Sequence, residues 1–183
     1  MANLNKWDYS GVDEMCFSDE KQESYKKAAE FLGDSVEDWG GGTGWAKRYF
    51  KNYKNIDGSL SKSTDVHADL TEYTSDCDNI LIRWVLETNP EWKTILENAK
   101  RSFRKRFCLV ICNPFVKKTR IGVHHIPVKA DGSKMEGEGI VEMYFARQDL
   151  LDCFPQTEYR VKEETIKVTH GYGRDWILYV EKI

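Results

Sequence analysis

Four glycines within five residues constrain this chain more than any other feature of its sequence. They form the segment Gly40-Gly41-Gly42-Thr43-Gly44, between a short expected strand at 35–39 and an expected helix at 45–50. Glycines at a strand-to-helix turn let the backbone approach a ligand closely, and the helix start offers free N–H groups. A plain tight turn would also explain these glycines, so the loop alone does not identify a ligand.

One acid before the glycines and two after them come in an order that indicates a nucleoside-containing ligand. Asp38 lies two positions before the first glycine and can hold an ammonium group or an ordered water. Asp57 ends a second expected strand, where an acid can accept hydrogen bonds from both ribose hydroxyls. Asp69, between Ala68 and Leu70, ends a third expected strand at 65–70 and could recognise adenine. Each acid alone would be an ordinary loop residue, and only their order favours a shared ligand.

The rest of the chain alternates between helix and strand patterns. Helices are expected at 18–32, ended by Gly33, at 90–103 and at 143–154. Buried strands are expected at 79–86 and 107–115, and a terminal hairpin at 159–168 and 176–183. This alternation predicts an α/β fold with a mostly parallel sheet in a single domain, 1–183. Arg83 interrupts the buried strand, so it needs either a ligand or an internal ion pair as its partner.

The glycine segment resembles motif I of the class I S-adenosylmethionine-dependent methyltransferases. Asp38, Gly40, Gly42 and Gly44 match the Asp-x-Gly-x-Gly-x-Gly pattern of that motif. The resemblance continues through the ribose-binding acid at 56–57, the adenine motif at 68–70 and the fourth strand at 78–87. It covers about residues 24–183, nearly the whole chain.

This resemblance implies a Rossmann-like, seven-stranded, mostly parallel sheet of order 3-2-1-4-5-7-6 with an antiparallel last strand. It also implies S-adenosyl-L-methionine as the cofactor and S-adenosyl-L-homocysteine as the product. The cofactor-binding residues would be Asp38, Gly40, Gly42, Gly44, Asp57, Ala68, Asp69 and Leu70. Arg83 is a further cofactor-binding candidate, because it lies near the carboxyl end of its strand, where ligands of open α/β sheets bind.

Two departures from the family pattern are visible. Only eleven residues separate Asp57 from Asp69, so either the helix between strands 2 and 3 is reduced or Asp69 is wrongly assigned. The segment 117–139 has no sustained periodicity and is expected to be a long loop over the acceptor side. The NAD fingerprint, Gly-x-Gly-x-x-Gly, is not matched, because its third glycine is missing at the required offset.

Methyl transfer to a neutral amine or alcohol can need a base that takes the acceptor's proton. His124 and His125 in the long loop are the candidate catalytic residues, and in an extended segment only one of them could face the site. The expected acceptor is a small molecule that the sequence does not identify. Two alternatives stay open: a non-catalytic module that binds S-adenosylmethionine, and a nucleic-acid methyltransferase.

Charge does not favour nucleic acid as the partner, since the net charge is −3. The one basic run is expected to be the solvated end of a helix and comprises Lys100, Arg101, Arg104, Lys105 and Arg106. Five irregularly spaced cysteines indicate reduced thiols rather than a disulfide or zinc framework. No apolar stretch could form a signal peptide or a membrane span, so we expect a cytoplasmic protein. The sequence does not predict the oligomeric state.

Overall fold

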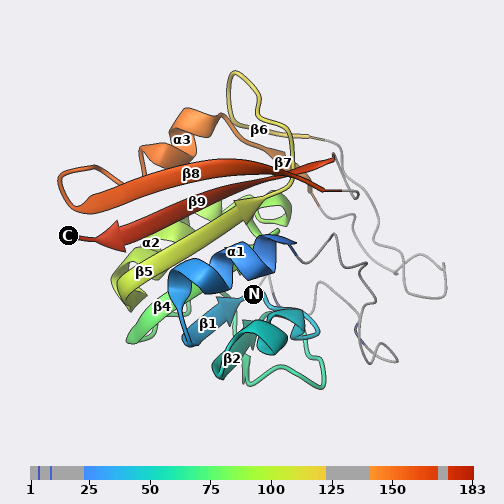
Figure 1. The fold of residues 1–183 in the computed structure, drawn as a ribbon. Coiled ribbons are helices and arrows are strands. Elements are labelled where there is room, and N and C mark those ends of the chain that lie inside the picture. The colour runs from blue at the N-terminus through green and yellow to red at the C-terminus, as the bar shows by residue number, and fades with distance from the viewer. Residues whose placement is uncertain (1–3, 5–8, 10–22, 123–140, 169–172) are drawn as a thin grey trace.

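Seven strands form one sheet in the order β3-β2-β1-β4-β5-β9-β8 (Figure 1). The computed structural model describes residues 4, 9, 23–122, 141–168 and 173–183. β9 runs antiparallel to both of its neighbours, β5 and β8, whereas the other pairs in the sheet are parallel. Counted along the chain, this is the predicted order 3-2-1-4-5-7-6 with an antiparallel last strand, which confirms the predicted fold. The strands of this sheet are β1 (Ser35–Trp39), β2 (Asn52–Asp57), β3 (Val66–His67), β4 (Cys77–Arg83), β5 (Phe103–Ile111), β8 (Tyr159–Lys167) and β9 (Arg174–Lys182).

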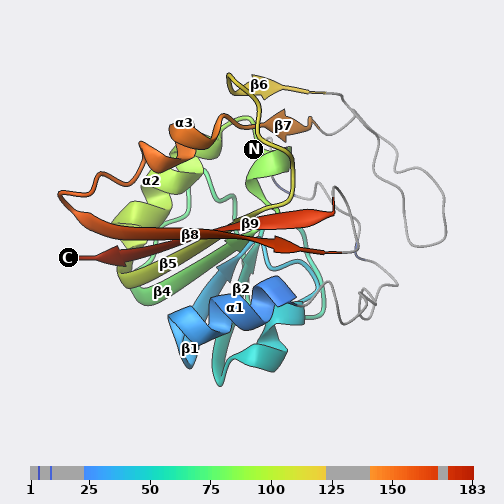
Figure 2. The same cartoon turned by 45° about the horizontal axis from the view of Figure 1, so that its top comes forward.

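Helices cover both faces of this sheet. The helix α1 (Glu23–Leu32) lies on one face, and α2 (Trp92–Ser102) and α3 (Arg147–Leu151) lie on the other (Figure 2). Two 3-10 helices, η2 (Trp45–Tyr49) and η3 (Leu86–Thr88), follow β1 and β4. Leu81 belongs to the core under α1 and its neighbour Ile82 to the core under α2, and both are fully buried. Coverage on both faces explains the continuous apolar run that predicted this strand.

The first helix ends where its sequence predicts. Gly33 has φ +82°, and its N–H donates to the carbonyl of Ala29 at 2.9 Å. A left-handed residue directly after the last helical turn is a common helix stop, and glycine adopts it without a Cβ clash. The expected helix start at 18–22 lies outside the described residues.

Several predicted helices are shorter in the structure. The expected helix after the glycines is the five-residue 3-10 helix η2, and Phe103 begins β5 instead of ending α2. The expected helix at 143–154 is divided into β7 (Met143–Tyr144) and α3. β7 pairs with β6 (Arg120–Ile121) in a separate two-stranded sheet. These apolar residues reach the core from either kind of element, which is why short apolar runs mislead periodicity arguments.

The link between β2 and β3 contains turns and no helix, as the short spacing predicts. β3 itself has only two residues, so the prediction that a strand runs to Asp69 is wrong. Asp69 starts a turn instead. Its Oδ1 accepts hydrogen bonds from the backbone N–H and the hydroxyl of Thr71, at 2.9 and 2.8 Å. An Asp that binds the backbone two residues ahead favours a turn over a continuing strand.

Candidate functional site

The glycine loop alternates between ordinary and left-handed backbone. Gly40, Gly42 and Gly44 have φ values of +79°, +56° and +80°. Residues with a Cβ rarely adopt such values, so the backbone path itself requires the Gly-x-Gly-x-Gly pattern. The three glycines that match motif I are therefore the three that the turn needs.

Packing also excludes side chains from this loop. A Cβ at Gly40 would collide with the side chain of Val85, and a Cβ at Gly44 would lie 2.6 Å from the Cβ of Ser63. A Cβ at Gly41 would lie 2.6 Å from the Oδ1 of Asn55. The protein's own atoms thus fill the space at these positions, so packing within the chain already requires glycine there.

Hydrogen bonds tie the glycine loop to the neighbouring strand β2. The N–H of Gly40 donates to the carbonyl of Ile56 at 2.6 Å, and the N–H of Gly42 donates to the Oδ2 of Asp57 at 2.8 Å. The carbonyl of Gly42 accepts from the Nδ2 of Asn55 at 2.9 Å and from the hydroxyl of Ser61 at 2.8 Å. The loop is therefore preorganised, with Asp57 held against it.

Asp38 lies at the end of β1, beneath the loop, with only 1% of its surface exposed. Its Oδ2 accepts a hydrogen bond of 2.8 Å from the hydroxyl of Tyr53. Burial raises the pKa of Asp38 to about 7, although the bond from Tyr53 and the charge of Arg83 oppose the rise. A buried carboxylate of this kind is suited to a cationic partner, which would lower its pKa again.

Asp57, at the end of β2, is the second buried carboxylate of the loop. Its Oδ1 accepts from the N–H of Ser59 at 2.7 Å. Burial raises the pKa of Asp57, while the backbone bonds from Ser59 and Gly42 oppose that rise. The N–H of Ala68 donates to the carbonyl of Asp57 at 3.0 Å, so the segment that follows β3 starts beside this acid.

The three residues of the predicted adenine segment have different environments. Leu70 is buried in the core under α2, and Ala68 is partly buried against the same core. Asp69 is buried too, and its carboxylate caps the turn through Thr71. The segment thus lies next to Asp57, and Asp69 has a structural role there whatever it binds.

Arg83, at the end of β4, is buried against α1. Its Nε donates to the hydroxyl of Ser24 at 2.9 Å, and its guanidinium lies 4.2 Å from the ring centre of Tyr25. On another side it lies 3.3 Å from the ring centre of Trp84. Aromatic faces attract cations, so these contacts fix α1 on the sheet beside Asp38.

Trp84 is the only non-glycine residue with a positive φ in the described part of the chain, at 60°. Its indole N–H donates to the Oδ1 of Asp175 at 3.1 Å, across the carboxyl end of the sheet. Left-handed backbone at a bulky residue costs free energy and persists only where the surroundings fix it.

Sequence reasoning missed three polar residues of this site. Tyr53 and Asn55 precede Asp57 at alternate positions of β2, and alternate residues of a strand share one face. That spacing could have identified them. Tyr9 comes from the distant N-terminal segment, and its hydroxyl would lie 3.2 Å from a Cβ at Gly42. No local sequence pattern indicates such a contact.

The predicted catalytic histidines, His124 and His125, lie outside the described residues. Among the residues that the structure does describe, no group of three His, Cys, Asp or Glu side chains could hold a metal ion. None of the described helices is both long and apolar enough to cross a lipid bilayer.

The basic run is divided between two elements. Lys100 and Arg101 end α2 as predicted, whereas Arg104, Lys105 and Arg106 belong to β5, where a helix end was expected. Most of these charges are paired: Lys100 with Glu97, Arg104 and Lys105 with Asp78, and Arg106 with Glu181.

Neither a family model nor a curated protein matches this sequence. Solved structures do match the fold. The 1,6-didemethyltoxoflavin-N1-methyltransferase of Burkholderia thailandensis, with bound S-adenosylhomocysteine, superposes with a TM-score of 0.66 at 13% identity. The match covers 90% of this chain and 78% of that one. The chain has the class I methyltransferase fold.

Two other class I structures are similar to the chain over nearly its whole length. The magnesium protoporphyrin IX methyltransferase of Synechocystis, with bound S-adenosylmethionine, has a TM-score of 0.60 at 12% identity and matches 96% of this chain and 89% of its own. A glycopeptide N-methyltransferase with bound S-adenosylhomocysteine has a TM-score of 0.61 at 10% identity. That match covers 94% of this chain and 90% of the glycopeptide enzyme. The TM-scores show that these proteins share the fold of the chain, and at such low identities the similarity concerns the fold alone.

Proposed function

We propose that this chain is an S-adenosylmethionine-dependent methyltransferase that acts on a small molecule. The observation that carries the proposal is the hydrogen bond from the N–H of Gly42 to the carboxylate of Asp57. It holds the acid that ends β2 against the left-handed glycine loop that follows β1, in a sheet with the class I strand order. A nucleoside bound at this edge would meet both features at once.

The residues of the site suit the chemical groups of S-adenosylmethionine. Asp38 offers a buried carboxylate to the ammonium group, which would replace the solvation that burial has removed. Asp57 has accepted one hydrogen bond on each oxygen and retains lone pairs for the ribose hydroxyls. Ala68, Asp69 and Leu70 follow β3 and begin beside Asp57, which makes them the proposed contacts of the adenine ring.

The protein's contribution to methyl transfer is mainly one of alignment. S-adenosylmethionine, when bound, supplies an already activated methyl group, so the chain has to hold it in line with the acceptor atom. The hydrogen-bonded glycine loop and the buried acids provide a rigid platform for this task. A neutral acceptor would also need a base, and His124 and His125 remain the candidates for that role.

One observation and one experimental outcome bear on the alternatives. The paired state of the basic run leaves little free charge there for a phosphate backbone, which weighs against a nucleic-acid acceptor. Binding of S-adenosylmethionine with no turnover on any acceptor class would instead point to a regulatory module.

Calorimetry with S-adenosylmethionine, S-adenosylhomocysteine and NAD tests the proposal. We expect both sulfur nucleosides to bind and NAD not to bind. The Asp57→Ala variant should lose about 10- to 100-fold in affinity, the usual effect of removing hydrogen bonds to a charged group. Asp76→Ala, which removes an exposed acid paired with Arg104, is the matched control and should bind normally. No binding of either sulfur nucleoside would refute the proposal, and unchanged affinity in Asp57→Ala would refute the ribose assignment.

A further inference from the structure

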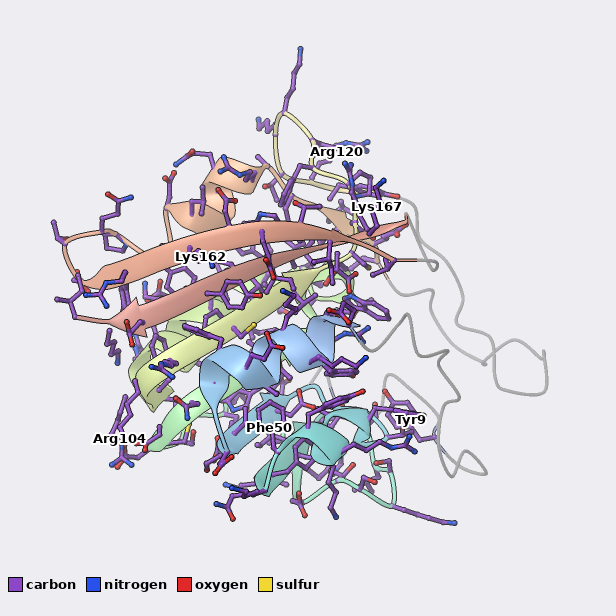
Figure 3. The ribbon with its side chains drawn as sticks, in the orientation of Figure 1. Tyr9, Phe50, Arg104, Arg120, Lys162 and Lys167 are labelled. Atoms are coloured by element: carbon purple, nitrogen blue, oxygen red, sulfur yellow. The ribbon has the colours of Figure 1, made fainter. Side chains whose placement is uncertain are left out.

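Five exposed cations lie around the small β6–β7 sheet and the turn end of the β8–β9 hairpin. We call them the rim cluster; its members are Lys117, Lys118, Arg120, Lys167 and Arg174. Figure 3 shows Arg120 and Lys167 toward one end of the molecule and Arg104 at the opposite end. The first end is the one toward which the parallel strands point (Figure 1).

Backbone hydrogen bonds fix the part of the rim cluster that precedes β6. The N–H of Val116 donates to the carbonyl of Phe145 at 2.9 Å. The N–H of Ala146 donates to the hydroxyl of Thr119 at 2.8 Å. The segment with Lys117 and Lys118 is therefore held beside the start of α3.

An aromatic contact joins this segment to the β8–β9 hairpin. The ring of Phe115 meets the ring of Trp176 edge-on, with 5.0 Å between their centres. Arg174 precedes Trp176 by two residues, so the two share a face of β9. Lys167 of β8 lies directly opposite Arg174 in the strand register of the hairpin. The two parts of the rim cluster therefore lie on either side of one aromatic contact.

The small sheet lies over the carboxyl ends of β4 and β5. The Nδ2 of Asn113, just after β5, donates to the carbonyl of Met143 in β7 at 2.9 Å. β7 also contacts η3, the 3-10 helix that follows β4. Ligands of open α/β sheets bind beyond the carboxyl ends of the strands. The rim cluster thus borders the acceptor half of the proposed site, and the glycine loop occupies the other half.

The five cations of the rim cluster are exposed and have no ion-pair partner among the described residues. Among the described residues, no carboxylate forms an ion pair with any of its five members, although Arg120 lies 5.4 Å from the ring centre of Tyr144. Some cations elsewhere do have acidic partners: Arg104 and Lys105 both form ion pairs with Asp78. Because the whole chain has a net charge of −3, a local positive surplus does not follow from its composition.

We infer that the methyl acceptor carries a carboxylate or phosphate group and that the rim cluster attracts it to the site. The inference rests on the proposed function, since it names the substrate class of that same site. Exposed cations of one sign around a site raise the local concentration of anions and the association rate, and salt screens this effect. The rim cluster would therefore select anionic acceptors over neutral molecules of the same shape.

The test compares two double variants of the protein saturated with S-adenosylhomocysteine. Lys167→Glu with Arg174→Glu reverses two rim charges. Lys162→Glu with Arg101→Glu is the matched control, because both residues are exposed and outside the rim cluster and the change in net charge is the same. Inorganic pyrophosphate is the small anionic probe, followed by calorimetry and by amide chemical shifts at 115–120 and 174–176. A short single-stranded DNA and vesicles of phosphatidylcholine with phosphatidylserine are the macromolecular probes.

We expect pyrophosphate to shift the rim amides, the rim variant to weaken its binding by about tenfold or more, and the control variant to change it by less than about twofold. Both variants should keep the wild-type affinity for S-adenosylhomocysteine, so failure of the proposed function would be seen separately as loss of that binding. In a methyl-transfer screen, carboxylate-bearing acceptors should be preferred to their amides, and added salt should reduce the preference. Equal weakening in both variants, no rim shifts, or much tighter binding of DNA or vesicles through the rim would overturn the inference.

Discussion

The hydroxyl of Tyr53 donates a hydrogen bond of 2.8 Å to the Oδ2 of Asp38, from the neighbouring strand. The strand register pairs Tyr53 with Val36 and Asn55 with Asp38, so this bond runs diagonally toward the carboxyl end of β1. Burial raises the pKa of Asp38 to about 7 despite that bond. The carboxyl group is therefore only partly ionised at neutral pH until a cation reaches it.

The raised pKa of Asp38 predicts that the binding of S-adenosylmethionine and S-adenosylhomocysteine depends on pH. The ammonium of S-adenosylhomocysteine needs the ionised form of Asp38, so its affinity should rise by about fivefold from about pH 6 to about pH 7 and by roughly tenfold up to about pH 8, where it levels off. Calorimetry across this range measures the effect. 5′-Methylthioadenosine, which lacks the amino-acid part, is the control and should show no such rise. If the affinities of both ligands changed equally with pH, Asp38 would not be the partner of the ammonium group.

Gly40→Ala should destabilise the protein more than Gly33→Ala. Both glycines have a left-handed φ, and alanine costs about 1 kcal/mol there. Gly33 has open space around the missing Cβ, whereas Gly40 faces Val85. The added collision should bring the loss at Gly40 to about 2 kcal/mol or more. Urea unfolding of the two variants measures the difference, and equal losses would show that Val85 moves aside freely.

The strand order was predictable because the chain's local patterns agree with its topology. The buried strand at β4 shows as an apolar run, and the glycine pattern marks the turn after β1. Element lengths were less predictable. Phe103 is fully buried, and a helix end or a strand start satisfies that burial equally well. Only the pairing of Phe103 with Cys77 across β4 and β5 decides for the strand.

The site was predictable where its residues are close in sequence. Asp38 and the glycines form one continuous motif, whereas Tyr9 approaches Gly42 from a distant segment. The environment of Arg83 was not predictable for the same reason. Its contacts with Ser24 and Tyr25 come from packing α1 on the sheet, and nothing in the local sequence specifies that packing.

Asp69→Asn separates the structural role of this residue from its proposed contact with adenine. Asparagine can still accept the two hydrogen bonds from Thr71, so the turn should survive. The loss of negative charge should weaken S-adenosylhomocysteine binding by about 3- to 10-fold, because the amino group of adenine prefers a charged acceptor. Calorimetry with S-inosylhomocysteine, which lacks that amino group, should show no change. A similar loss for both ligands would mean that the turn itself had moved.

Glu87 is a second buried carboxyl group with a raised pKa. It lies in η3, directly after β4, and 4% of its surface is exposed. Its Oε1 accepts a hydrogen bond of 2.8 Å from the N–H of Cys112, and no described residue is a hydrogen-bond partner of its Oε2. Burial raises the pKa of Glu87 to about 7, although the bond from Cys112 opposes the rise.

Glu87→Gln should therefore stabilise the protein at high pH relative to low pH. Below the ordinary glutamate pKa, the folded and unfolded states both hold the proton, and the pKa difference costs nothing. As the pH rises from there to about 7, the unfolded chain releases the proton and the folded one retains it, so stability is lost progressively. Glutamine keeps the acceptor for Cys112 and removes this loss, on the order of 1 to 3 kcal/mol. Urea unfolding at about pH 5 and about pH 8 measures it, with exposed Glu97→Gln as the control. A difference between wild type and Glu87→Gln that does not change with pH would show that Glu87 is ionised in the folded protein throughout this range.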